Sequence, residues 1–100
     1  MKLVEKVRAL AAAHPYGVAE DKYVWAGQPE CIIGHALVSE GWSVDALEGE
    51  TRSVWALCRS GTIPGVSVAD ERWLQRVQTA QDEGHTWAVA VELADKEWGQ

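Results

Sequence analysis

The chain has 100 residues, 47% of them apolar and 24% charged, and a formal net charge of −6. This composition excludes a disordered protein, and the length predicts one domain, residues 1–100, with a single core. No apolar run approaches the roughly 20 residues of a membrane span, and the first residues lack the uninterrupted apolar segment of a secretory signal, so we expect a cytoplasmic protein.

Residues 2–13 predict an amphipathic helix. Their apolar side chains recur at helical spacing and form one stripe, made of Leu3, Val4, Val7, Leu10 and Ala11. The helix should end at His14, because the residue before a proline is disfavoured in the α region and residue 15 is a proline.

Residues 18–28 are the best place for extended structure. Tyr23, Val24 and Trp25 have the aromatic and β-branched side chains that favour a strand, and Ala26 and Gly27 after them can form a turn. We therefore expect a short β-hairpin near residues 18–28, lying against the helices because an isolated hairpin is only marginally stable.

A central helix is predicted from about Glu30 to Glu40, ending at Gly41. Pro29 suits the first turn of such a helix, and Glu30 suits the positive end of its dipole. The segment between them is apolar on every side, so the helix should be surrounded by the rest of the protein. Gly34 lowers helix propensity by about 1 kcal/mol, which favours a close approach of another helix at that point.

Three further helices and one short turn are predicted in the second half. Ser43 can cap a turn over residues 44–47, and a helix follows over about residues 51–59. Ser67 opens the next helix in an approximate capping box, and residues 82–84 end it. The last helix runs from Thr86 to about Trp98. The predicted fold class is mainly α (α+β at most), with four to five helices around a buried central helix.

The two cysteines, Cys31 and Cys58, both lie in apolar runs. Thiols stay reduced in the cytosol, and a free cysteine in such a run behaves as a small hydrophobic residue. We therefore predict two buried free thiols rather than a disulfide.

Cys31 and His35 are the sharpest candidates for catalysis. At positions i and i+4 they share a helical face, the helix dipole can lower the thiol pKa, and a Cys–His pair can activate a nucleophile. A nucleophile also needs exposure, an orienting group and an oxyanion hole, whereas the neighbours Ile32 and Ile33 indicate burial. We interpret both as core residues, with His35 bonded to a backbone carbonyl or a carboxylate, and keep the reactive pair as an alternative.

No metal or cofactor site is predicted. The cysteines are far apart, and His14, His35 and His85 are scattered, so the closed ligand spacing of a zinc site is missing. No glycine-rich phosphate loop exists, and paired carboxylates such as Glu20 and Asp21 have no apolar pocket to separate their pKa values. We expect no cofactor and no enzymatic activity.

Six tryptophans and no phenylalanine are the most unusual feature of the composition. They occur about once per predicted element, as expected if each element places one large ring in a shared core. Indole rings also favour partly hydrated interfaces. We therefore expect four tryptophans in the core, with Trp42 and Trp98 exposed enough to dock a partner.

Two segments carry a family resemblance. Residues 27–37 resemble a G-x-P-x-C-[LI]-[IV]-G-H-A-L stretch, and residues 73–91 resemble W-L-x-x-V-Q-x-x-Q-D-x-G-x-x-W-x-x-A-V. Both recur, in this order, in small accessory proteins of unknown function encoded by actinobacteriophages, notably mycobacteriophages. The resemblance covers most of the chain, least well over residues 42–66. It implies a protein expressed inside a bacterial host and able to be toxic to it, and it transfers no catalytic residue.

The expected function is non-enzymatic: a phage-type accessory protein that binds a bacterial host protein and alters its activity. The first alternative is a nucleic-acid-associated regulator, which requires four arginines to converge on one face: Arg52, Arg59, Arg72 and Arg76. The acidic balance argues against that reading, because phosphate binding needs several cations together. The second alternative is an enzyme that uses Cys31 and His35 in an open pocket. Self-association is also open, and no membrane partner is expected.

Overall fold

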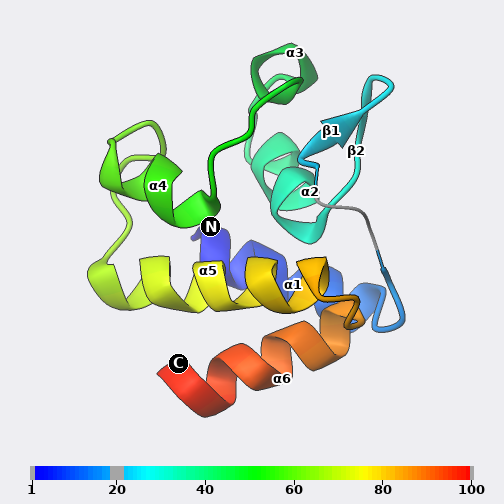
Figure 1. Ribbon diagram of the computed structural model, residues 1–100, viewed down its shortest axis with the longest axis vertical. Coiled ribbons are helices and arrows are strands. Elements are labelled where there is room, and N and C mark those ends of the chain that lie inside the picture. The colour runs from blue at the N-terminus through cyan, green and yellow to red at the C-terminus, as the bar shows by residue number, and fades with distance from the viewer. Residues whose placement is uncertain (1, 19–21, 100) are drawn as a thin grey trace.

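The computed structural model describes residues 2–18 and 22–99, which form a mainly helical fold with one short β-hairpin (Figure 1). The elements in chain order are α1 (Leu3–Ala13), β1 (Val24–Trp25), β2 (Gln28–Pro29), α2 (Ile32–Ser39), α3 (Val44–Leu47), α4 (Val54–Arg59), α5 (Val68–Asp82) and α6 (Trp87–Trp98). The predicted fold class is confirmed, with six helices in the described residues, of which α3 is a single turn.

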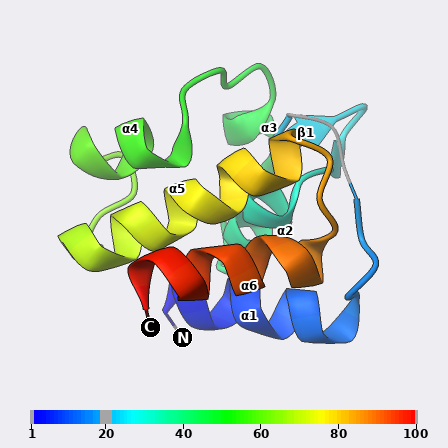
Figure 2. The same cartoon turned by 60° about the horizontal axis from the view of Figure 1, so that its bottom comes forward.

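The longest helix, α5, organises the packing. It packs most extensively against α6 and also contacts α4, while α1 packs against α2 and α6 (Figure 2). Four of its side chains are fully buried, namely Trp73, Leu74, Val77 and Ala80. By contrast, α2 is not surrounded on every side as predicted, because His35 and Val38 remain half-exposed. The face of α2 that carries His35 and Val38 therefore lies at the surface of the molecule.

The start of α2 differs from the prediction. Pro29 is not in its first turn but lies in β2, opposite Val24, and α2 begins only at Ile32. The cause is the turn before it, where Ala26 (φ 53°) and Gly27 (φ 78°) both have the positive φ that a two-residue hairpin turn requires. This turn folds residues 28 and 29 back along β1. The expected hairpin is thus present, with its paired residues at 24–25 and 28–29.

Gly34 lies against the hairpin rather than against another helix. A Cβ atom at this position would lie 2.0 Å from the backbone oxygen of Tyr23. The prediction of a close approach is therefore right, but the neighbour is the chain entering β1. The missing side chain lets α2 and the hairpin pack backbone to backbone.

Hydroxyl side chains cap four helices. Ser43 and Ser67 each accept a hydrogen bond from the backbone N–H three residues later, as their predicted capping positions require. Thr86 makes the same bond, so it caps α6 and the helix itself begins at Trp87. Ser53 caps α4 in the same way, so this helix begins at Val54 and not near residue 51.

Three glutamines of α5 hold the starts of two other helices. Gln81 accepts a hydrogen bond from the N–H of Ile32 at 2.7 Å, which anchors the first turn of α2. Gln78 accepts from the N–H of Val54 at 2.8 Å, and Gln75 accepts from the next residue of α4 at 3.0 Å. The first N–H groups of a helix have no partner inside it, so α5 supplies acceptors that buried helix starts would otherwise lack.

A second polar cluster joins α1, α5 and α6. Arg8 forms a two-pronged ion pair with Asp95, one of whose contacts is 2.9 Å long, and it lies 4.8 Å from the ring centre of Trp73. The indole N–H of Trp73 donates to the same carboxylate at 2.9 Å. Together these contacts hold the pKa of Asp95 below its usual value.

Candidate functional site

Cys31 and His35 are not assembled as a nucleophile and its base. The Cys31 thiol is buried at the start of α2, where Sγ accepts a hydrogen bond from the N–H of Gly34 at 3.2 Å. Burial raises the pKa of this thiol to about 11, against the smaller lowering effect of the hydrogen bonds that it accepts. The helix-end effect expected from the sequence is therefore outweighed by desolvation, and the thiolate is disfavoured.

His35 packs against an aromatic ring. Its imidazole meets Trp87 edge to face, with ring centres 5.3 Å apart, and His14 meets the same indole at 6.2 Å. Burial lowers the pKa of His35, with a smaller opposing effect from Glu30. The open hollow beside it, of about 370 Å³, includes both histidines, Glu30 and Trp87 in its lining. In residues 2–18 and 22–99, no three or more His, Cys, Asp or Glu side chains are placed to hold a metal ion.

Both cysteines are free and buried, which confirms the prediction. Burial also raises the pKa of Cys58 to about 11, with a further contribution from the nearby carboxylate of Glu71. The two thiols therefore lie in the interior as apolar side chains.

The tryptophans divide differently from the prediction. Trp73 and Trp87 are buried, and Trp98 is 43% exposed, as expected. Trp42, by contrast, is half-buried and packs against the core, where its backbone N–H donates to the carbonyl of Leu37 as the chain turns back after α2.

Two tryptophans expected in the core are exposed instead. Trp25 is 60% exposed and Trp55 is 44% exposed. Each exposed tryptophan of the described residues lies beside a cation: Lys22 is 5.2 Å from the ring centre of Trp25, Arg59 is 5.4 Å from that of Trp55, and Arg72 is 5.1 Å from that of Trp98. Trp55 and Arg59 are one helical turn apart, so their contact could have been predicted from the sequence.

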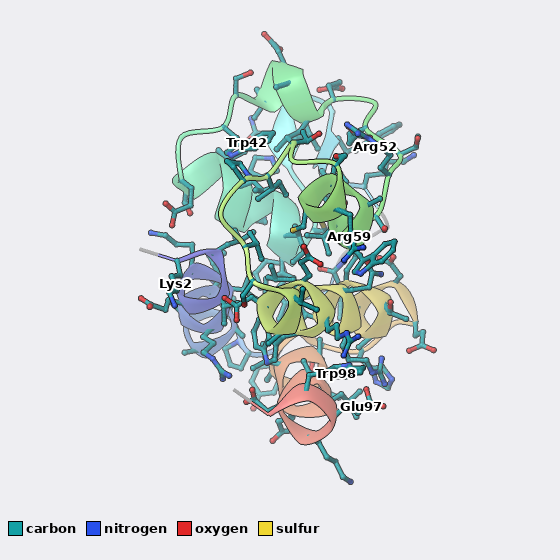
Figure 3. The ribbon with its side chains drawn as sticks, turned by 90° about the vertical axis from the view of Figure 1, so that its left-hand side faces the viewer. Lys2, Trp42, Arg52, Arg59, Glu97 and Trp98 are labelled. Carbon is teal, nitrogen blue, oxygen red and sulfur yellow. The ribbon has the colours of Figure 1, made fainter. Side chains whose placement is uncertain are left out.

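Two of these pairs are carried by three helices, α4, α5 and α6. Within α4, Arg59 stacks on Trp55, and its guanidinium lies 4.0 Å from the carboxylate of Glu71 on α5. The next residue of α5, Arg72, stacks on Trp98 of α6. The exposed Val68 lies one turn before Arg72 on α5. In Figure 3, Arg59 lies above α5 and Trp98 below it on this side of the molecule. The surface formed by Trp55, Arg59, Val68, Arg72 and Trp98 is called the Trp–Arg face below.

The four arginines do not form an unpaired basic array. Arg52 makes a two-pronged pair with Glu50, the shorter contact being 2.8 Å, and Arg76 pairs with Glu97 and, at 3.5 Å, with Glu83. Arg59 and Arg72 belong to the Trp–Arg face. Three of the four guanidiniums thus lie within 4.0 Å of a carboxylate.

No helix in residues 2–18 and 22–99 combines the length and apolar character that crossing a membrane demands. Comparison of the chain with family models, with curated proteins and with solved structures finds no match.

Proposed function

We propose that this chain is a non-enzymatic accessory protein that binds a bacterial host protein through the Trp–Arg face and alters its activity. The observation that supports this most is the presence of two exposed tryptophan–arginine contacts on helices α4 to α6, Trp55 with Arg59 and Trp98 with Arg72. The phage setting rests on the resemblance of residues 27–37 and 73–91.

The composition of the Trp–Arg face suits protein binding. Tryptophan and arginine are the residues most enriched among those that dominate the energy of protein interfaces. An indole already stacked on a guanidinium has less rotamer freedom to lose on binding. A smaller part of the binding free energy is therefore offset by the entropy cost of ordering the side chain. Val68, 52% exposed and one turn before Arg72 on α5, adds apolar area.

The charges of the face indicate the chemistry of its partner. Arg72 stacks on an indole, which leaves guanidinium N–H groups at the ring edge for an acceptor, and Arg59 lies at the long distance of 4.0 Å from Glu71. Carboxylates are the acceptors that fit a guanidinium best. The partner should therefore present apolar side chains together with one or more carboxylates.

The alternatives have weaker support. A nucleic-acid regulator needs unpaired cations, whereas Glu71, Glu83 and Glu97 lie among the arginines of α4 and α5. An enzyme based on Cys31 needs an accessible thiolate, whereas this thiol is 2% exposed with a raised pKa.

The proposal is tested by affinity purification from a mycobacterial lysate with the wild-type chain and three variants. Trp55→Ala and Arg72→Glu change the Trp–Arg face, and Tyr16→Ala removes an exposed aromatic ring that lies outside it and is 87% exposed. We expect one defined host protein in the wild-type and Tyr16→Ala eluates, depleted in the other two. Equal recovery by all four chains, or recovery of nucleic acid in place of a protein, contradicts the proposal.

A further inference from the structure

Glu71 on α5 is a buried carboxylate with an unsatisfied oxygen. The residue is only 5% exposed, and its Oε2 atom accepts no hydrogen bond from the part of the chain that the structure describes. Such groups are rare, because an ionised carboxyl without a hydrogen-bond donor is costly in the interior of a protein. The negative charge of Glu71 also contributes to the raised pKa of Cys58 on α4. Oε2 of Glu71 is therefore an acceptor in need of a donor.

Arg59 on α4 lies close to this oxygen without bonding to it. Its Nη1 atom is 4.0 Å from Oε2 of Glu71, which is about 1 Å longer than a charge-assisted hydrogen bond. The arginine side chain is 55% exposed, so packing does not fix it in one place. Its guanidinium is 5.4 Å from the ring centre of Trp55, near the outer limit of a cation–π contact. Arg59 thus lies between two attractive groups and contacts neither of them closely.

The other tryptophan–arginine pair of the Trp–Arg face has no such acceptor. Arg72 lies 5.1 Å from the ring centre of Trp98, and no carboxylate in residues 2–18 and 22–99 pairs with it within 4.0 Å. Without the Trp98 ring, Arg72 would be left with water. Without the Trp55 ring, Arg59 would still have a buried carboxylate of its own chain beside it. The two pairs therefore differ in one internal acceptor, Glu71.

We propose that Arg59 has two positions, over Trp55 in the free protein and hydrogen-bonded to Glu71 when another group covers the Trp55 ring. In the second position the guanidinium donates to Oε2 and supplies the donor that this buried carboxylate lacks. The new ion pair offsets the loss of the cation–π contact, so a partner can pack on the ring at little cost. Arg72 then remains to bind a carboxylate of the partner. The inference rests on the proposed function for its role in binding.

A double-mutant cycle on Arg59 and Glu71 tests the second position in the protein alone. Arg59→Met and Glu71→Gln are made singly and together, both in the wild-type chain and in Trp55→Ala, where the ring is removed instead of covered. Denaturant unfolding gives the factor by which the two groups raise each other's contribution to the unfolding equilibrium constant. We expect at most about fivefold in the wild-type chain, as for a long contact, and about tenfold or more in Trp55→Ala, as for a charged hydrogen bond.

The matched control is Trp98→Ala, in which the factor should keep its wild-type value because Arg72, and not Arg59, loses its ring. Equal factors in the wild-type and Trp55→Ala chains, or equal increases in both tryptophan variants, overturn the proposal.

NMR of the arginine side chains provides a second measurement that leaves Glu71 in place. Hydrogen exchange between the Arg59 guanidinium and water should slow about fivefold or more in Trp55→Ala and stay unchanged in Trp98→Ala, because a donor bonded to a buried carboxylate is protected. Unchanged exchange in Trp55→Ala also overturns the proposal. Neither measurement contains a partner, so failure here does not decide whether a host protein binds, and failure of the affinity purification does not decide whether Arg59 moves.

Discussion

A cysteine at the N-cap of a helix invites comparison with reactive thiols, yet Cys31 has the opposite chemistry. The helix end and the N–H of Gly34 favour the thiolate, but desolvation is the larger effect and raises the pKa to about 11. Burial also raises the pKa of Cys58 to about 11, and there the nearby carboxylate of Glu71 adds to the effect. Position on a helix therefore predicts thiol reactivity only when burial is known.

The raised thiol pKa values predict resistance to alkylation. At mildly alkaline pH, a pKa near 11 in place of 9.0 leaves about one hundredth of the usual thiolate. Iodoacetamide should therefore modify the native chain at least about a hundredfold more slowly than the chain unfolded in guanidinium chloride, as followed by mass spectrometry. Rapid labelling of Cys31 in the native state would contradict this account and revive the enzyme alternative.

His35 predicts a loss of stability in mild acid. Burial lowers its pKa in the folded state, so the unfolded chain binds the proton more tightly. The free energy of unfolding should fall as the pH drops through the unfolded value of about 6.5 and on toward the lower folded value. Denaturant melts at a series of pH values should show this slope, reduced in His35→Gln and retained in the exposed control His85→Gln. The same slope in both variants would show that another group causes it.

At the scale of elements, the glutamines of α5 act as acceptors for other helices, which is a role that helical periodicity does not reveal. Gln78 is buried and serves both Val54 and Tyr23, whose hydroxyl it reaches at 2.9 Å. Gln75, three residues earlier, makes the equivalent bond to α4 where solvent has access. The two positions are therefore a matched pair that differs in burial.

Replacing each of these glutamines by methionine should separate burial from hydrogen bonding. Gln78→Met leaves the N–H of Val54 buried without an acceptor and should cost about 1–3 kcal/mol. Gln75→Met lets water replace the lost acceptor and should cost under about 1 kcal/mol. Denaturant unfolding measures both, and equal costs would mean that the buried bond has no special importance.

Gly34→Ala tests the contact between α2 and the hairpin. Alanine gains about 1 kcal/mol of helix propensity, but its Cβ would lie 2.0 Å from the Tyr23 oxygen, so a net loss of about 1–3 kcal/mol is expected. In Gly99→Ala the nearest atom to the new Cβ is 3.8 Å away, and stability should change little. A stabilised Gly34→Ala chain in thermal melts would show that the hairpin can move aside at no cost.

Much of the element order could be predicted from the sequence, because local signals fix it. The apolar stripe of residues 3–11 and the capping hydroxyls of Ser43, Ser67 and Thr86 act within a few residues. The turn at Ala26 and Gly27 was predicted, but the path of residues 28–31 was not, since it depends on Pro29 lying opposite Val24 in β2 instead of opening α2. The stack of Arg72 on Trp98 also depends on how α5 and α6 pack, which no local pattern records.

At the scale of the whole molecule, the acidic chain carries two exposed tryptophan–arginine pairs on its helices α4 to α6. The Trp–Arg face spans α4, α5 and α6, and residues 51–81 include four of the five arginines while the net charge of the chain is −6.

The central claim is that the Trp–Arg face supplies the binding energy for a host protein. Calorimetric titration of the purified host partner with the wild-type chain, Trp55→Ala and Trp98→Ala tests it most directly. Each variant should raise Kd by about ten- to a hundredfold, as loss of an interface tryptophan does, while the free energy of unfolding changes by less than about 1 kcal/mol. Unchanged Kd values for both variants would contradict the claim.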